Sequence, residues 1–250
     1  MKVYKLLNNI MLMLFFMFSV ETFATSSSKL SHMKVDLSNQ QSLQRGAKIF
    51  INYCLSCHSA AYMRYNRMGQ ELSIVDDVLK ENLMFGAEKV GDVMSISMRQ
   101  EDSINYFGVA PPDLSVIARS RGADWLYSYF LTFYKDESRP FGVNNLVYKD
   151  TAMPHVLWEL QGIQRLASKK DVTAVYYDPT YKDYLELLTP GKQTEKQYDR
   201  TIRDLVNYLV YISEPIKLKR TKIGVWVMFY LFIFLLITYM LKKDYLKDIH

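Results

Sequence analysis

The five residues Cys54-Leu55-Ser56-Cys57-His58 constrain this chain more than any other stretch of its sequence. The pattern C-x-x-C-H is an attachment sequence for a c-type haem. Two thiols three positions apart on a helical turn can each add to one vinyl group of a haem, and the adjacent His58 then lies under the ring. Covalent linkage keeps the cofactor in a small, partly exposed domain. The sequence therefore predicts one covalently bound haem c, held by Cys54, Cys57 and His58.

Two other uses of a Cys pair fit less well. A structural zinc ion usually takes four Cys or His ligands, whereas this chain has two cysteines and four scattered histidines. A thioredoxin-like redox pair gives no reason for the histidine after Cys57, and the chain shows no βαβ pattern. Covalent haem remains the preferred interpretation.

An iron that only transfers electrons needs a sixth ligand, and the candidates are the other histidines and the methionines. His250 follows an apolar stretch at 223–241 that is predicted to cross a membrane, which places it on the far side from the haem. His32 lies in the polar segment from Thr25 to about Ser42. Met153 follows a long loop and precedes Pro154, which biases its backbone to an extended conformation. The residues alone favour Met153 and leave His155 open. A methionine ligand would raise the reduction potential relative to two histidines.

Two arginines, Arg119 and Arg121, follow the extended dipeptide Pro111-Pro112. A haem carries two propionates, and a guanidinium group forms paired hydrogen bonds with a carboxylate. On the residues alone, a pair of solvated surface arginines is the default interpretation.

The segment from Ile223 to Leu241 contains no charged residue. As a helix its nineteen residues would span about 28 Å, close to the hydrocarbon thickness of about 30 Å. Apolar residues occupy every face, which argues against a buried core helix. We predict a transmembrane helix at 223–241.

The N-terminus has the layout of a secretory signal peptide. Lys2 and Lys5 precede an apolar stretch from Ile10 to Val20, and small residues surround Ala24. The stretch is too short to span a bilayer comfortably, although an uncleaved anchor is the alternative. The predicted organisation is a signal peptide at 1–24, a periplasmic c-type haem domain at 25–222, the transmembrane helix at 223–241 and a cytoplasmic tail at 242–250.

The net charge of +5 does not indicate a nucleic-acid partner. Between Thr25 and Ile216 there are 22 Lys and Arg against 23 Asp and Glu, and the surplus cations flank the apolar runs. The basic residues therefore belong to the membrane edges rather than to a DNA-binding face.

Hydrophobic periodicity predicts a mainly α domain with long loops. No stretch reads convincingly as a sheet, and residues 171–196 are interpreted as a surface insertion. Helical spacing is predicted for Ser42–His58, Asp76–Leu83, Ala123–Tyr134 and Tyr198–Ile212.

Several stretches in this order resemble the cytochrome c1 family, the haem subunits of ubiquinol–cytochrome c reductase (bc1) complexes. They are Arg45–His58, Phe107–Tyr127 with its APPDLS, Asn144–Gly162 with its AMPH, and Tyr198–Pro215 before the C-terminal anchor. The resemblance implies a c-type cytochrome core whose first and last soluble helices cross, enlarged by long loop insertions and followed by one transmembrane helix.

The resemblance also implies roles for individual residues. Cys54 and Cys57 would form thioethers, His58 would be the proximal ligand, Met153 the distal ligand, Arg121 a propionate partner, and Pro111 and Pro112 part of the haem pocket.

The implied partners are cytochrome b, the Rieske iron–sulfur protein and a soluble or tethered cytochrome c, in the inner membrane of a bacterium. The chain would be a redox subunit without catalysis of its own. The acidic docking patches of some family members do not transfer to this nearly neutral domain. A stand-alone tethered cytochrome, and a haem sensor or peroxidase with an open iron, are the alternative functions.

Overall fold

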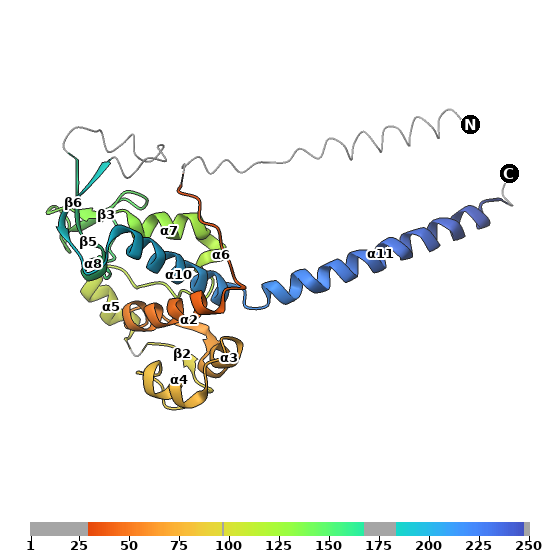
Figure 1. The fold of residues 1–250 in the computed structure, drawn as a ribbon, viewed down its shortest axis with the longest axis horizontal. Helices are drawn as coiled ribbons and strands as arrows, with labels where there is room; N and C mark the ends of the chain where they lie inside the picture. The colour runs from red at the N-terminus through yellow and green to blue at the C-terminus, as the bar shows by residue number, and fades with distance from the viewer. Residues whose placement is uncertain (1–29, 97, 168–183, 248–250) are drawn as a thin grey trace.

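A computed structural model describes residues 30–96, 98–167 and 184–247. The predicted signal peptide, His250 and the first half of the 171–196 stretch (171–183) lie outside these residues. Helices predominate, as the sequence predicts (Figure 1).

The body is organised around α10 (Glu195–Ser213), which α2 (Gln40–Ile49) crosses. A capping box between Thr194 and Gln197 starts α10, and the Asn39 side chain caps α2. The helices approach closely at Gly46, where an added Cβ would lie 2.1 Å from the carbonyl oxygen of Asp204. The first and last helices of the body therefore cross, as the family resemblance implies.

A buried carboxylate joins the two helices. Asp204, which is 5% exposed, accepts hydrogen bonds from Arg45 Nε at 2.5 Å, from Arg45 Nη2 at 3.0 Å and from Ser42 Oγ at 2.6 Å. Asn207 Nδ2 donates in turn to Ser42 Oγ at 3.0 Å. A carboxylate that has left water needs such donors, because burial without them is costly.

Replacing Asp204 by alanine is expected to lower the free energy of unfolding by about 2–4 kcal/mol, because buried donors lose their acceptor. The measurement is the midpoint of thermal unfolding of the full chain in mild detergent. Asp102→Ala is the matched control, since its pair with Arg99 is exposed and is expected to leave the midpoint unchanged. Equal midpoints for Asp204→Ala and Asp102→Ala would contradict the prediction.

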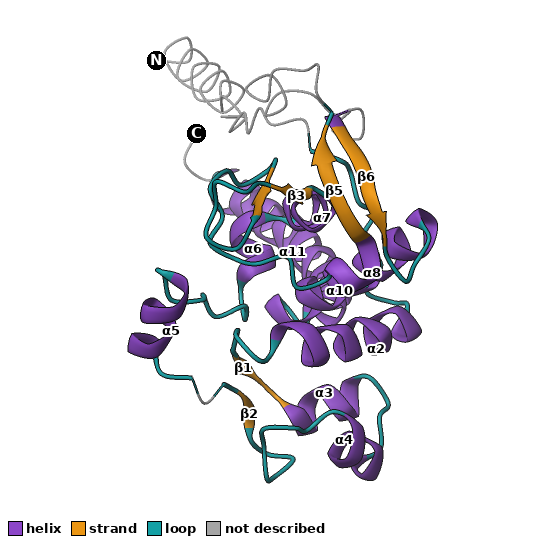
Figure 2. Cartoon of the chain, turned by 90° about the vertical axis from the view of Figure 1, so that its left-hand side faces the viewer, coloured by secondary structure: helices purple, strands orange, loops and turns teal. Residues whose placement is uncertain are grey.

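The opposite side of α10 carries α7 (Ala123–Leu131), so that α2 and α7 flank α10 (Figures 1 and 2). The short helices α6 (Ile117–Arg121) and α8 (Trp158–Gln161) also contact α10. The buried side chains of these elements form one hydrophobic core, which includes Phe50, Leu126, Ile202, Leu205 and Leu209.

The remaining elements of the body are short. The helices are η1 (Phe50–Cys54, a π-helical turn), α3 (Tyr65–Glu71), α4 (Asp76–Asn82) and α5 (Gln100–Phe107). The strands are β1 (Ala60–Arg64), β2 (Val93–Met94), β3 (Phe133–Lys135), β4 (Val143–Asn145), β5 (Gly162–Leu166) and β6 (Leu185–Pro190).

The strands correct the expectation that the chain has no sheet. β1 pairs with β2, β3 with β4 and β5 with β6, each antiparallel. Strands of two to six residues are too short to give a readable alternation, which explains why the sequence did not reveal them. The β5–β6 hairpin lies above α8 in Figure 2, and the exposed β6 fits the surface position predicted for that part of 171–196.

The helix α11 (Lys217–Tyr245) includes the predicted span 223–241 and extends beyond it on both sides. Its 29 residues make it the one helix of the described chain that is long and apolar enough to cross a membrane. It leaves the body as a separate rod with none of its side chains buried (Figure 1).

Candidate functional site

One cavity of about 450 Å³ brings together the seven residues that the family resemblance assigns to a haem site. Its volume lies within the usual range of cofactor sites, about 300–1,000 Å³. The seven predicted residues among those that line it are Cys54, Cys57, His58, Pro111, Pro112, Arg121 and Met153.

Cys54 is the last residue of η1, which continues α2 directly, and Cys57 lies in the turn that follows. The amide of Leu55 donates to the Phe50 carbonyl at 3.0 Å, a five-residue step, and the His58 amide then donates to the Cys54 carbonyl at 2.8 Å. Cys54 is buried and Cys57 partly exposed, and burial raises the pKa of the Cys54 thiol to about 12. Both sulfurs are therefore brought to the cavity on one tight turn, and the buried one is uncharged.

The imidazole of His58 is fixed by a single strong hydrogen bond. Its Nδ1 lies 2.7 Å from the carbonyl oxygen of Pro112. Because a carbonyl only accepts, Nδ1 carries the proton and Nε2 keeps its lone pair. Burial lowers the pKa of His58 and outweighs the opposing effect of the Pro112 bond. A neutral imidazole with a free Nε2 is the form that binds a metal.

The carbonyl of Pro112 is in place because its segment runs along the residues after His58. The Leu114 amide donates to the Ser59 carbonyl at 2.8 Å, and the Ala61 amide donates to Asp113 Oδ2 at 3.0 Å. The APPDLS stretch therefore orients the histidine as well as lining the cavity.

Met153 reaches the same cavity from the loop between β4 and α8, and it is partly buried. Its Sδ lies 3.4 Å from the hydroxyl oxygen of Tyr129. The thioether is a soft, uncharged sulfur ligand in a site that already offers an imidazole.

Of the two predicted arginines, only Arg121 lines the cavity. Its guanidinium carbon lies 5.1 Å from the ring centre of Trp125 and 5.8 Å from that of Tyr148, which positions the cation between two aromatic faces. Arg119 is exposed and lies outside the cavity lining.

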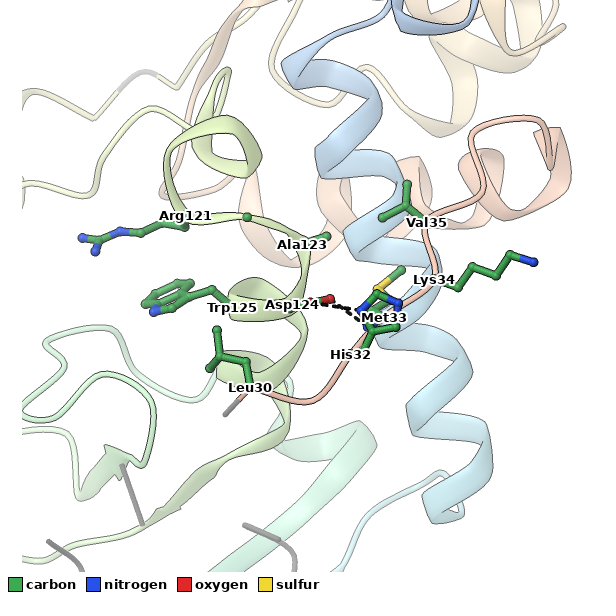
Figure 3. Close-up of a pocket in the computed structure, with 10 residues that line it drawn as sticks. Leu30, His32, Met33, Lys34, Val35, Arg121, Ala123, Asp124 and Trp125 are labelled. Carbon is green, nitrogen blue, oxygen red and sulfur yellow. Dashed lines mark hydrogen bonds and ion pairs between the residues drawn. The ribbon is translucent and has the colours of Figure 1, made fainter. Parts of the chain in front are cut away.

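The other candidate histidine ligands in the described chain lie elsewhere. His32 pairs with Asp124 at 3.1 Å beside a second, open cavity of about 600 Å³, and Figure 3 shows Arg121 pointing away from this pair. His155 is buried and stacked on Phe133 with ring centres 4.8 Å apart, and burial lowers its pKa to about 4. Neither lines the cavity that holds Met153.

The sequence did not identify the aromatic lining of the cavity. Trp125 and Tyr129 come from α7, a helix rich in aromatic residues whose orientation the sequence does not give. Their spacing of four residues places them on one helix face and could have indicated a shared wall. The aromatic residues that line the cavity are Tyr53, Phe107, Trp125, Tyr129, Phe130 and Tyr148.

The chemistry of the cavity fits a c-type haem. Apolar and aromatic walls suit a flat apolar macrocycle, two thiols suit its vinyl groups, and an arginine suits its carboxylates. A neutral imidazole and a thioether are the axial donors found together in electron-transferring c-type cytochromes.

Comparison with known proteins agrees with this chemistry. The model of the "Cytochrome C1 family" matches residues 31–249. Cytochrome c1 of Allochromatium vinosum is 43% identical, over 88% of this chain and 90% of the relative. A protein of Nitrosomonas europaea named ammonia monooxygenase gamma subunit is 45% identical, over 89% of each chain. Cytochrome b/c1 of Bradyrhizobium diazoefficiens is 25% identical, over 83% of this chain and 33% of the relative.

Proposed function

The chain belongs to the cytochrome c1 family of electron carriers, and from that premise we propose that it is the haem subunit of a bc1 complex. In this role it takes one electron from the Rieske iron–sulfur protein and passes it to a periplasmic cytochrome c. The family implies a covalent c-type haem. The observation that supports the proposal is the single cavity shared by Cys54, Cys57, His58 and Met153.

The residues divide the work of holding the cofactor. Cys54 and Cys57 would hold it through thioether bonds, and His58 Nε2 and Met153 Sδ would be the protein ligands of its iron. When bound, the haem supplies a one-electron ferrous–ferric couple. With His58 and Met153 both bound to the iron, no position would be open to a substrate, and the chain would serve as a redox subunit.

The second layer of residues keeps these ligands in place. The hydrogen bond from His58 Nδ1 to Pro112 fixes the imidazole plane and increases the basicity of Nε2. Arg121, held by Trp125 and Tyr148, offers a guanidinium to a propionate, and Pro111 and Pro112 form part of the wall.

The proposed placement in the cell combines the membrane anchor α11 with the predicted signal peptide, which sets the orientation. The domain at 25–222 would lie in the periplasm of a bacterium, the tail at 242–250 in the cytoplasm, and the signal peptide at 1–24 would direct export. Only Glu214–Ile216 separates α10 from α11, so the haem domain would lie close to the inner membrane.

Cytochrome b is the proposed neighbour in that membrane. The Bradyrhizobium relative carries both names, b and c1, in one protein, which supports a direct association of the two. The Nitrosomonas relative supports a second candidate, an electron-transfer subunit attached to a membrane monooxygenase.

Purification of the full chain through an affinity tag in mild detergent tests the proposal. We expect a b-type cytochrome and an iron–sulfur protein to co-purify with the chain. We also expect the chain to keep its haem after acid–acetone extraction of the denatured protein. Covalent thioether bonds survive that treatment, whereas coordinated haem does not.

The other outcomes are equally specific. Recovery with a monooxygenase would favour the second candidate, and recovery alone with electron transfer retained would favour a stand-alone tethered cytochrome. A colourless chain after extraction would refute the attachment through Cys54 and Cys57.

A further inference from the structure

We propose that Tyr129 is a positioning residue for the electron-transfer site: its hydroxyl group, oriented by Thr151, donates a hydrogen bond to the sulfur of Met153 and so raises the reduction potential. The inference rests on the proposed function, because it takes Met153 as the distal iron ligand.

The three side chains form a short chain of polar contacts at the wall of the cavity. Tyr129 Oη lies 2.9 Å from Thr151 Oγ1 and 3.4 Å from Met153 Sδ. The thioether can only accept, and the tyrosine has a single proton to give. Both contacts are satisfied when Thr151 donates to Tyr129 and Tyr129 donates to Met153.

The tyrosine ring is held rigidly in this orientation. It stacks on Trp125 with ring centres 5.0 Å apart and planes within 9°, and it meets Phe133 edge-on, also at 5.0 Å. The Tyr129 backbone carbonyl accepts a hydrogen bond from Asn145 Nδ2 at 2.8 Å. A donor fixed by packing on several sides orients its acceptor more effectively than a mobile one.

The hydroxyl and its threonine partner are both buried. Tyr129 is 6% exposed and Thr151 4% exposed. Water therefore does not compete strongly for either partner.

The consequence for the iron follows from the electronics of sulfur. A thioether has two lone pairs, so one can bind the metal while the other accepts the hydrogen bond. The bond withdraws electron density from the sulfur, weakens its donation to iron, and favours the ferrous state over the ferric state. Hydrogen bonds to ligand sulfurs are among the established means of tuning iron-centre potentials.

The test is a redox titration of the full chain, purified in detergent with its haem, as wild type and as Tyr129→Phe. The variant keeps the ring and loses the hydroxyl. We expect a low-spin spectrum and a ferric-to-ferrous ratio about threefold higher at a fixed potential. This is a fall of about 30 mV in the midpoint, because tenfold corresponds to about 59 mV for one electron.

A matched control exists in the same chain. Tyr208 Oη donates to the Met68 sulfur at 3.1 Å, in the core and outside the cavity. Tyr208→Phe removes the same kind of hydroxyl-to-thioether bond, and we expect no shift of its midpoint. Thr151→Val gives a second, independent variant: losing the polarising donor should lower the midpoint by less than Tyr129→Phe does.

An unchanged midpoint in Tyr129→Phe and Thr151→Val, with the low-spin spectrum intact, would overturn this inference and leave the proposed function standing. Equal shifts in Tyr129→Phe and Tyr208→Phe would overturn it too, since the effect would not depend on the ligand. A wild-type chain without a low-spin haem would refute the proposed function and the inference together.

Discussion

The Met153→Leu variant is expected to lose the low-spin spectrum of a His/Met site and to bind CO in its ferrous form at neutral pH. Leucine has nearly the volume of methionine, so the fold should lose less than about 1.5 kcal/mol. Leucine has no lone pair for the iron, and the sixth position opens. The midpoint potential should fall on the order of 0.1 V, within the range of about 0.8 V that axial ligands control.

The control for this variant is Met94→Leu, the same substitution at a fully buried methionine outside the cavity. Its absorption spectrum and CO response should match those of the wild type. A wild-type spectrum in Met153→Leu would show that the ligand assignment is wrong. The open-iron sensor or peroxidase would be supported instead if the wild-type protein itself bound CO readily.

The local parts of this site could be predicted from the sequence. The spacing of Cys54, Cys57 and His58 is set by one turn of chain, and Met153 stands out through the proline that follows it. Helical periodicity likewise predicts α10 to within a few residues, although the capping box starts it at Glu195 rather than at Tyr198.

The non-local parts of the site could not be predicted in this way. The bond between His58 and Pro112 joins residues 54 positions apart, and no local pattern marks it. Arg119 and Arg121 are two positions apart, which on a helix turns their side chains to nearly opposite sides. Only one of them can reach the cavity. The residues alone do not show which, and it was the family resemblance that pointed to Arg121. The role of Tyr129 depends on which residues α7 packs against. Periodicity predicts the buried face of this helix but not the residues that the face contacts.

Replacing Gly46 by alanine is expected to disrupt the domain, because Gly46 lies where α2 and α10 cross. An added Cβ would lie 2.1 Å from the Asp204 carbonyl oxygen and 2.6 Å from the Tyr208 Cβ. The Asp204 oxygen belongs to the backbone, and the Tyr208 Cβ is bonded directly to the backbone Cα of Tyr208. Neither atom can rotate away. The two helices would have to separate.

The substitution is expected to destabilise the folded domain, because overpacking outweighs the gain in helix propensity. Alanine improves helix propensity by about 1 kcal/mol over glycine, but overpacking costs about 1–3 kcal/mol and sometimes more. Separating the helices also strains the hydrogen bonds that Ser42 and Arg45 make to Asp204. We expect the free energy of unfolding to fall by about 3 kcal/mol or more, the combined effect of overpacking and a weakened buried hydrogen-bond network.

The same substitution should reduce the yield of haem-containing protein, because the crossing supports the cavity from both helices. Cys54 follows α2 through η1, and Leu209 of α10 lines the cavity. The measurements are the thermal midpoint and the haem absorbance per protein of the full chain in detergent. Gly86→Ala is the control, since no atom lies within 4 Å of its added Cβ. If Gly46→Ala matched Gly86→Ala in both measurements, the close approach of α2 and α10 would not be what holds the cavity together.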